Sequence, residues 1–128
     1  MTISAWTYEA RQASPDGRLV AEVVDLNEVG MGAPTRGTLR ISNGLTRERC
    51  SPSFVWSEDS EYLAIPEWTE RRNQRLVIVS MSRREGRYAP GEYSVLELAE
   101  FDGGVVRGVD SPIHLPRVVE VDVGGLGW

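Results

Sequence analysis

The sequence has one cysteine, one histidine and no lysine among its 128 residues. These low counts restrict the disulfides and the catalytic sites that the chain can form. Cys50 has no second cysteine with which to form an intramolecular disulfide. The N-terminal stretch MTISAWTYEA has neither the basic region nor the apolar run of a secretory signal peptide. No apolar run approaches the roughly 18 residues that a membrane-spanning helix needs. We therefore expect a cytoplasmic protein without membrane spans or disulfides.

Residue combinations that carry catalysis are also missing. The sequence contains no Gly-x-Ser-x-Gly nucleophile elbow, no phosphate-binding Gly-Lys-Ser/Thr loop and no pair of close cysteines. His114 lies between two prolines, and Cys50 could form a thiolate site with it only if the fold brought them together. We predict no enzyme activity, no metal and no cofactor. A small-ligand or enzymatic pocket near His114 is the alternative.

The charge is acidic overall and unevenly distributed. The formal net charge is −5, whereas a general nucleic-acid-binding protein needs a positive surface toward the phosphates. Direct nucleic-acid binding is therefore not expected. Residues 70–87 hold six arginines and two glutamates, while residues 92–110 hold five carboxylates and one arginine. This pattern predicts a molecule with separate basic and acidic regions.

Period-two alternation of apolar and polar residues predicts an all-β protein with a single domain, residues 1–128. Residues 5–24 are expected to form a hairpin, with AWTYEARQ as the first strand and SPDG as the turn. Asn43-Gly44 predicts a second tight hairpin. The segment RLVIVSM is apolar on both faces and is expected in the middle of a sheet. Further strands are expected at residues 61–68, 92–101 and 117–123, although the leucine and glutamate content of residues 92–101 would also suit a short helix.

Short motifs recur along the chain at a fixed spacing. Asp16, Asp59 and Asp102 are each 43 residues apart, and each lies in a turn before an apolar strand. A period of this length is typical of β-propeller blades. The segments ASPDGRLVAEV and FVWSEDSEYLAIPEW resemble the blade motif of TolB-type and WD40-type propellers. The resemblance implies four-stranded blades and a protein-binding scaffold without catalysis.

Three such units are fewer than the roughly four to eight blades of a closed propeller. We therefore expect antiparallel, blade-like sheets that form a sandwich or an incomplete barrel or propeller. Two segments are predicted to be loops longer than packing requires, residues 25–37 and residues 69–75.

Long loops are the expected place for a binding site. The residues predicted to contact a partner are Glu22, Asp25, Glu28, Trp68, Arg71 and Arg72. After Arg18, no arginine close in sequence compensates the first two of these acidic residues. Trp68 is expected either to be partly exposed at a strand end or to belong to the core.

We predict a non-catalytic, protein-binding function. Its sharpest form is an immunity-type inhibitor that neutralises a bacterial toxin, since an acidic surface suits toxins that are basic because they attack nucleic acids. A general scaffold or adaptor is the second possibility. The sequence leaves the oligomeric state and the identity of the partner open.

Overall fold

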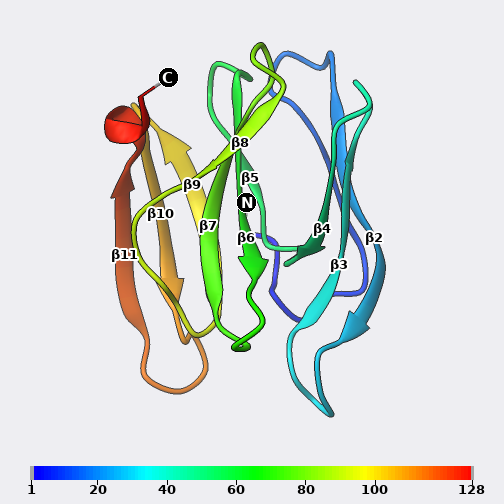
Figure 1. Ribbon diagram of the computed structural model, residues 1–128, viewed down its shortest axis with the longest axis vertical. Helices are drawn as coiled ribbons and strands as arrows, with labels where there is room; N and C mark the ends of the chain where they lie inside the picture. Colours follow the sequence, from blue (N-terminus) through cyan, green and yellow to red (C-terminus); the bar gives the residue numbers. More distant parts are fainter. Residues whose placement is uncertain (1, 128) are drawn as a thin grey trace.

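The chain folds into three consecutive groups of antiparallel strands, which confirms the all-β fold class. The computed structural model describes residues 2–127. The strands are β1 (Ala10–Ala13), β2 (Val20–Glu28), β3 (Thr35–Ile41), β4 (Thr46–Cys50), β5 (Val55–Trp56), β6 (Tyr62–Trp68), β7 (Gln74–Ser80), β8 (Glu85–Tyr88), β9 (Leu96–Asp102), β10 (Val105–Asp110) and β11 (Arg117–Asp122). A 3-10 helix, η1 (Val123–Leu126), follows. We call β1–β4, β5–β8 and β9–β11 the first, second and third blades (Figure 1).

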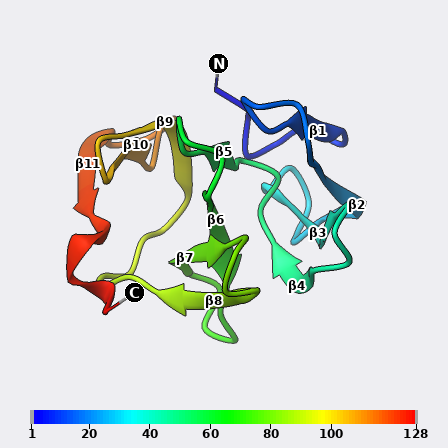
Figure 2. The same cartoon turned by 90° about the horizontal axis from the view of Figure 1, so that it is seen from above.

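Within each blade, strands that follow one another in sequence are hydrogen-bonded neighbours. In the strand ladder, a single residue pair, Cys50 with Glu67, joins the first blade to the second, and the third blade is a separate sheet. Seen from above, β1, β5 and β9 lie along one side of the molecule (Figure 2). We call this side the inner-strand face. The described strands therefore form blade-like antiparallel sheets in one domain and do not close into a barrel.

The second blade lies between two apolar cores. Its contribution to the core shared with the first blade consists of Trp56, Leu63, Ile65, Val77 and Val79. Its contribution to the core shared with the third blade includes Ala64, Leu76 and Ile78. Adjacent residues of a strand point to opposite faces, so both faces of β6 and β7 are covered. The prediction that RLVIVSM lies in the middle of a sheet is confirmed.

A serine and an aspartate build the turn between β1 and β2. The Ser14 hydroxyl donates to Asp16 Oδ1 at 2.6 Å and accepts from the Leu19 backbone N–H at 3.1 Å. Gly17, the fourth residue of the turn, has a φ of 72°, which glycine adopts without steric cost. The side chains therefore satisfy backbone groups that the reversal of the chain would leave unpaired.

The same bonds recur in the turn between β5 and β6. The Ser57 hydroxyl donates to Asp59 Oδ1 at 2.6 Å and accepts from the Tyr62 N–H at 2.9 Å. Ser60 takes the place of the glycine and has a φ of 63°. The two turns also touch, because the Asp16 N–H donates to the Ser60 hydroxyl at 3.0 Å. The sequence similarity of the two segments is therefore matched by the same side-chain hydrogen bonds in both turns.

The third predicted unit forms a different turn. Asp102 ends β9 and lies opposite Val105 in the ladder. Gly103 and Gly104 alone connect the strands, and both have positive φ values, 58° and 77°. Such a two-residue reversal needs two residues that tolerate positive φ, which the glycine pair provides. The turn-plus-strand unit with serine and aspartate is thus present twice.

The predicted first strand, residues 5–12, is largely wrong, because β1 begins only at Ala10. The preceding residues cross between blades. The Ala5 N–H donates to Glu97 on β9 at 3.2 Å, and the Ala5 carbonyl accepts from the Thr35 N–H at 3.0 Å. The Thr35 hydroxyl donates to the Thr7 carbonyl at 2.6 Å. The backbone of this segment is used to join the third blade to the first.

Both predicted long loops are shorter than expected. β2 continues to Glu28 and β3 starts at Thr35, so only residues 29–34 connect them. The ladder absorbs the extra residues in a bulge after Val24, where Asp25 has a φ of 57°. The second loop ends at residue 73, because Gln74 already pairs with Trp68. The Asn43-Gly44 hairpin between β3 and β4 is confirmed.

Replacement of Ser57 by alanine should destabilise the fold. Ser57 is 3% exposed, and its loss leaves the Tyr62 N–H, which is partly buried, without its acceptor. The expected loss is about 1–3 kcal/mol in the free energy of unfolding, measured by urea denaturation. Ser94→Ala, which removes an exposed hydroxyl, is the control and should stay within about 0.5 kcal/mol of the wild type. Equal effects of the two changes would contradict the role of the turn.

Candidate functional site

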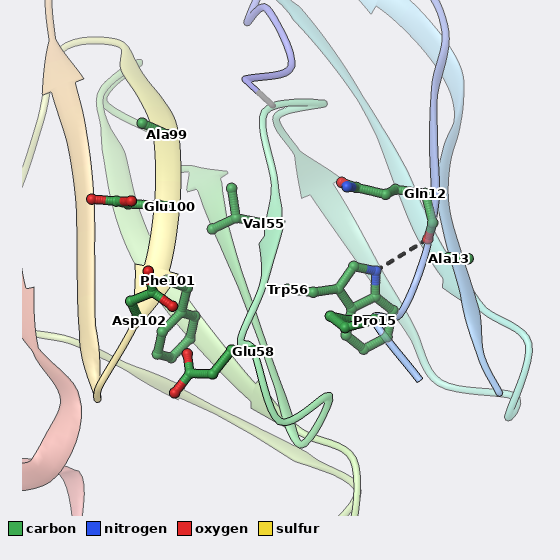
Figure 3. Close-up of a pocket in the computed structure, with 10 residues that line it drawn as sticks. All are labelled: Gln12, Ala13, Pro15, Val55, Trp56, Glu58, Ala99, Glu100, Phe101 and Asp102. Carbon is green, nitrogen blue, oxygen red and sulfur yellow. Dashed lines mark hydrogen bonds between the residues drawn. The ribbon is translucent and has the colours of Figure 1, made fainter. Parts of the chain in front are cut away.

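A groove opens on the inner-strand face, where the three blades come together (Figure 3). Its volume is about 260 Å³. The lining residues come from all three blades and are Gln12, Ala13, Pro15, Val55, Trp56, Glu58, Ala99, Glu100, Phe101 and Asp102. Residues far apart in the sequence therefore form one surface, because each blade contributes its innermost strand or the turn next to it.

Buried polar contacts hold the three strands of the groove in place. The Trp56 indole N–H donates to the Gln12 carbonyl at 3.1 Å, which fixes β5 beside β1 (Figure 3). On the other side, the Leu98 N–H donates to the Ser53 hydroxyl at 3.0 Å. Trp56 is only 7% exposed. The floor of the groove is thus partly aromatic.

Carboxylates stand at the third-blade side of the groove. Glu58 reaches from the second blade toward Phe101 and Asp102 (Figure 3), and its Oε1 accepts from the Gly103 N–H at 3.1 Å. Glu100 follows on β9 and pairs with Arg107 at 3.5 Å. The groove therefore combines an apolar floor with an acidic rim.

The acidic rim continues over the outer surface of the third blade. Arg107 on β10 lies opposite Glu100 and Glu120 and forms ion pairs with both, at 3.5 and 3.0 Å. Further carboxylates lie on the same surface, with Asp102 and Asp122 opposite Val105 and Glu97 opposite Val109. We define the acidic face as Glu97, Glu100, Asp102, Glu120 and Asp122. Five carboxylates surround one guanidinium, so the face carries a net negative potential.

The predicted acidic contacts lie elsewhere, on the first blade. Glu22 forms an ion pair with Arg11 at 3.5 Å and lies opposite Arg40 across the ladder. The expectation that it lacks a compensating arginine is therefore wrong, since its partners are cross-strand neighbours. Asp25 is exposed in the bulge of β2, and Glu28 is exposed at the end of that strand. Both are separate from the acidic face.

Glu28 is engaged by its surroundings as well. Its carboxylate accepts from the Gly32 N–H at 3.4 Å. A hydrogen bond to the same carboxylate raises the pKa of Tyr8, because the bond favours the protonated phenol. Glu28 therefore stabilises the end of the β2–β3 hairpin, whatever further role it has.

Trp68 is a core residue, which is one of the two positions expected for it, and it is not partly exposed at the strand end. Only 4% of it is exposed. It is the last residue of β6 and pairs with Gln74 on β7. Arg71 and Arg72 are exposed in the turn that follows. The predicted cluster of a tryptophan and two arginines therefore supplies only its arginines to the surface.

Trp68→Ala should affect folding and not partner contact. Removal of a buried tryptophan costs about 3–5 kcal/mol, through lost apolar burial and the cavity left behind. The free energy of unfolding, from a denaturant titration, checks this. Arg71→Ala in the adjacent turn is the control and should change stability by less than about 0.5 kcal/mol. A fully stable Trp68→Ala protein would contradict the burial of the ring.

A buried carboxylate joins the first and second blades. Glu67 is 7% exposed. Arg47 on β4 donates to Glu67 Oε2 through Nε and Nη2, at 3.0 and 2.8 Å. The Tyr88 hydroxyl donates to Oε1 at 2.6 Å, and this bond raises the pKa of Tyr88. A carboxylate at such depth is tolerated because both oxygens have donors.

Cys50 and His114 do not form a catalytic pair. Cys50 is fully buried at the contact between the first two blades, next to Glu67. Burial, with a further contribution from the Glu67 charge, raises the pKa of the thiol to about 12. His114 is exposed in the loop after β10. The predicted alternative of a Cys–His thiolate site is therefore not supported by their positions.

The Cys50 thiol should be unreactive in the folded protein. A thiol with a pKa of about 12 remains protonated at pH 8, and the thiolate is the reactive form. Alkylation by iodoacetamide, followed by mass spectrometry, should be at least about 100-fold slower in native protein than in urea-denatured protein. Similar rates in the two states would show that the thiol is accessible.

Searches for other kinds of site and for relatives gave negative results. Among residues 2–127, no three histidine, cysteine, aspartate or glutamate side chains are grouped so that they could hold a metal ion. In the same range, no helix is long and apolar enough to span a membrane. Comparisons with models of known protein families, with curated proteins and with solved structures found no match. The likeness to propellers stays a resemblance of short motifs.

Proposed function

We propose that this protein is a non-catalytic, cytoplasmic protein-binding protein that takes a basic protein partner on its acidic face and in the adjoining groove. In its sharpest form it is an immunity-type inhibitor that neutralises a basic bacterial toxin. The observation that carries the proposal is the gathering of five carboxylates around the single guanidinium of Arg107. Surfaces of one charge speed association with partners of the opposite charge.

Apolar groups among the carboxylates support a protein partner. Val118 is 81% exposed and lies opposite Val109 on the third blade. The groove adds the edges of Trp56 and Phe101. Protein interfaces combine apolar centres of this kind with a charged rim, whereas a purely ionic surface would serve steering alone. The two features together fit a partner that presents basic and apolar side chains.

A general scaffold or adaptor would use the same surface. The two possibilities differ in what the partner does. If the protein neutralises a toxin, a toxic reading frame beside its gene should lose its toxicity when this chain is co-expressed. If it is an adaptor, the captured partner should have no such toxicity.

A pocket near His114 favours a second candidate, the binding of a small ligand. The pocket has a volume of about 370 Å³ and lies between the β2–β3 and β10–β11 connections. Trp6, Pro34 and Ile113 give it an apolar lining, with His114 at its side. Concave, largely apolar pockets with a few polar groups are typical of ligand sites.

Neutralisation of the acidic face should slow partner association. We expect the triple variant Glu100→Gln, Asp102→Asn, Glu120→Gln to associate about ten-fold more slowly with the basic partner at low salt, and the difference should shrink as salt screens the field. Surface plasmon resonance with a partner captured from a native lysate measures the rates. The control is the triple variant Glu22→Gln, Asp25→Asn, Glu28→Gln, which loses the same charge on the first blade.

Two outcomes would redirect the proposal. If the first-blade variant slows association and the third-blade variant does not, the partner binds around the β2–β3 hairpin. If both bind like the wild type while His114→Ala abolishes biological activity in folded protein, the small-ligand function is favoured instead.

A further inference from the structure

Within residues 2–127, the third blade has one strand fewer than each of the other two. The first and second blades each have four strands, ending in β4 and β8, whereas the third has three, in the order β11-β10-β9. In residues 2–127, no strand pairs with the outer edge of β11. β11 therefore has the position that β3 and β7 have in their blades, but without an outer neighbour (Figure 2). An open edge of this kind can accept another strand.

The backbone of β11 directs an alternating set of donors and acceptors toward this edge. The Val123 N–H donates to the Gly104 carbonyl at 2.9 Å, on the side of β10. In an antiparallel ladder the direction of the backbone groups alternates from residue to residue. The backbone N–H and C=O groups of Val119 and Val121 therefore point toward β10. Those of Val118 and Glu120 point away from it. These outward groups are free to pair with an additional strand.

We propose that the protein partner inserts an extended segment beside β11 and completes the third blade as an antiparallel fourth strand. The inference rests on the proposed function and describes how the basic partner is held. Main-chain hydrogen bonds would provide affinity, and side-chain alternation would provide specificity.

The two faces of the blade define the sequence of the added strand. On the outer face, its side chains would lie beside Glu120 and Asp122, which favours arginine or lysine. On the other face they would lie beside Val119 and Val121, which are partly buried against the core of the third blade. The occupant is therefore a segment in which basic and apolar residues alternate.

Charge argues against a second copy of this chain at the same edge. An antiparallel pair of two β11 strands related by two-fold symmetry would bring Glu120 and Asp122 close to their equivalents in the other copy. Like charges on neighbouring strands are destabilising. A basic strand meets the same carboxylates with opposite charge, so it is the occupant that the edge favours.

The probe for the test is an acetylated and amidated peptide of about eight residues in which arginine and valine alternate. Residues opposite Val118 and Glu120 would be the arginines, and their backbone N–H groups would bond to β11. N-methylation of the arginines removes these donors, whereas N-methylation of the valines removes donors that point away. The two methylated peptides have the same charge and serve as a matched pair.

The protein variants form a second matched pair. Glu120→Gln removes the charge and keeps the backbone N–H, while Glu120→Pro removes both. Because the Glu120 N–H is not part of the ladder with β10, proline is expected to be tolerated there. Far-ultraviolet circular dichroism and thermal unfolding check the fold of both variants.

We expect the unmodified peptide to bind and to slow amide hydrogen exchange at Val118 and Glu120. Glu120→Gln should weaken binding a few-fold, and Glu120→Pro should weaken it at least about ten-fold further. The arginine-methylated peptide should lose binding, and the valine-methylated peptide should keep it. If Glu120→Pro does not fold, the methylated peptides decide the question with wild-type protein.

Equal binding of Glu120→Pro and Glu120→Gln, or of the two methylated peptides, would overturn the added strand. The charge-based function would stand in that case if the triple neutralisation of the acidic face still weakened binding. If that triple variant also bound the peptide and the partner like the wild type, the proposed function would fail together with the inference.

Discussion

Both faces of the second blade are apolar, and this requires a sheet on each side of it. Leu76 and Ile78 face one core while Val77 and Val79 face the other. The first and third blades cover these two faces. The groove follows from the same arrangement, since it brings β1, β5 and β9 to one side of the molecule (Figure 2).

Features set by neighbouring residues were predictable from the sequence. The apolar residues on both faces of β7 indicated a central strand, because this pattern depends on local alternation. Asn43-Gly44 indicated the β3–β4 hairpin, because a tight turn depends on local backbone preference. The serine and aspartate turns at Asp16 and Asp59 were recognisable for the same reason. The serine and aspartate side chains of each turn bond to each other and to backbone groups no more than five residues away.

Features set by contacts between distant segments were not predictable in this way. The arginines beside Glu22 come from two other strands, and Trp68 is buried although it ends its strand beside a polar turn. The acidic composition of residues 92–110 did indicate an acidic region. It could not show that Glu120 from β11 and Glu58 from the second blade would join it, because these positions meet only through the register of the third blade and the turn at Gly103.

The N-terminal crossing at Ala5 has a consequence for how the domain unfolds. Blades that contact only their neighbours behave as a one-dimensional array, in which an end unit can detach while the rest remains folded. Ala5 bonds to Thr35 on the first blade and to Glu97 on the third, so it links the two ends of the array directly. Detachment of either end blade must then break this link as well. The cooperativity of the whole domain thus depends in part on a segment that has no regular secondary structure.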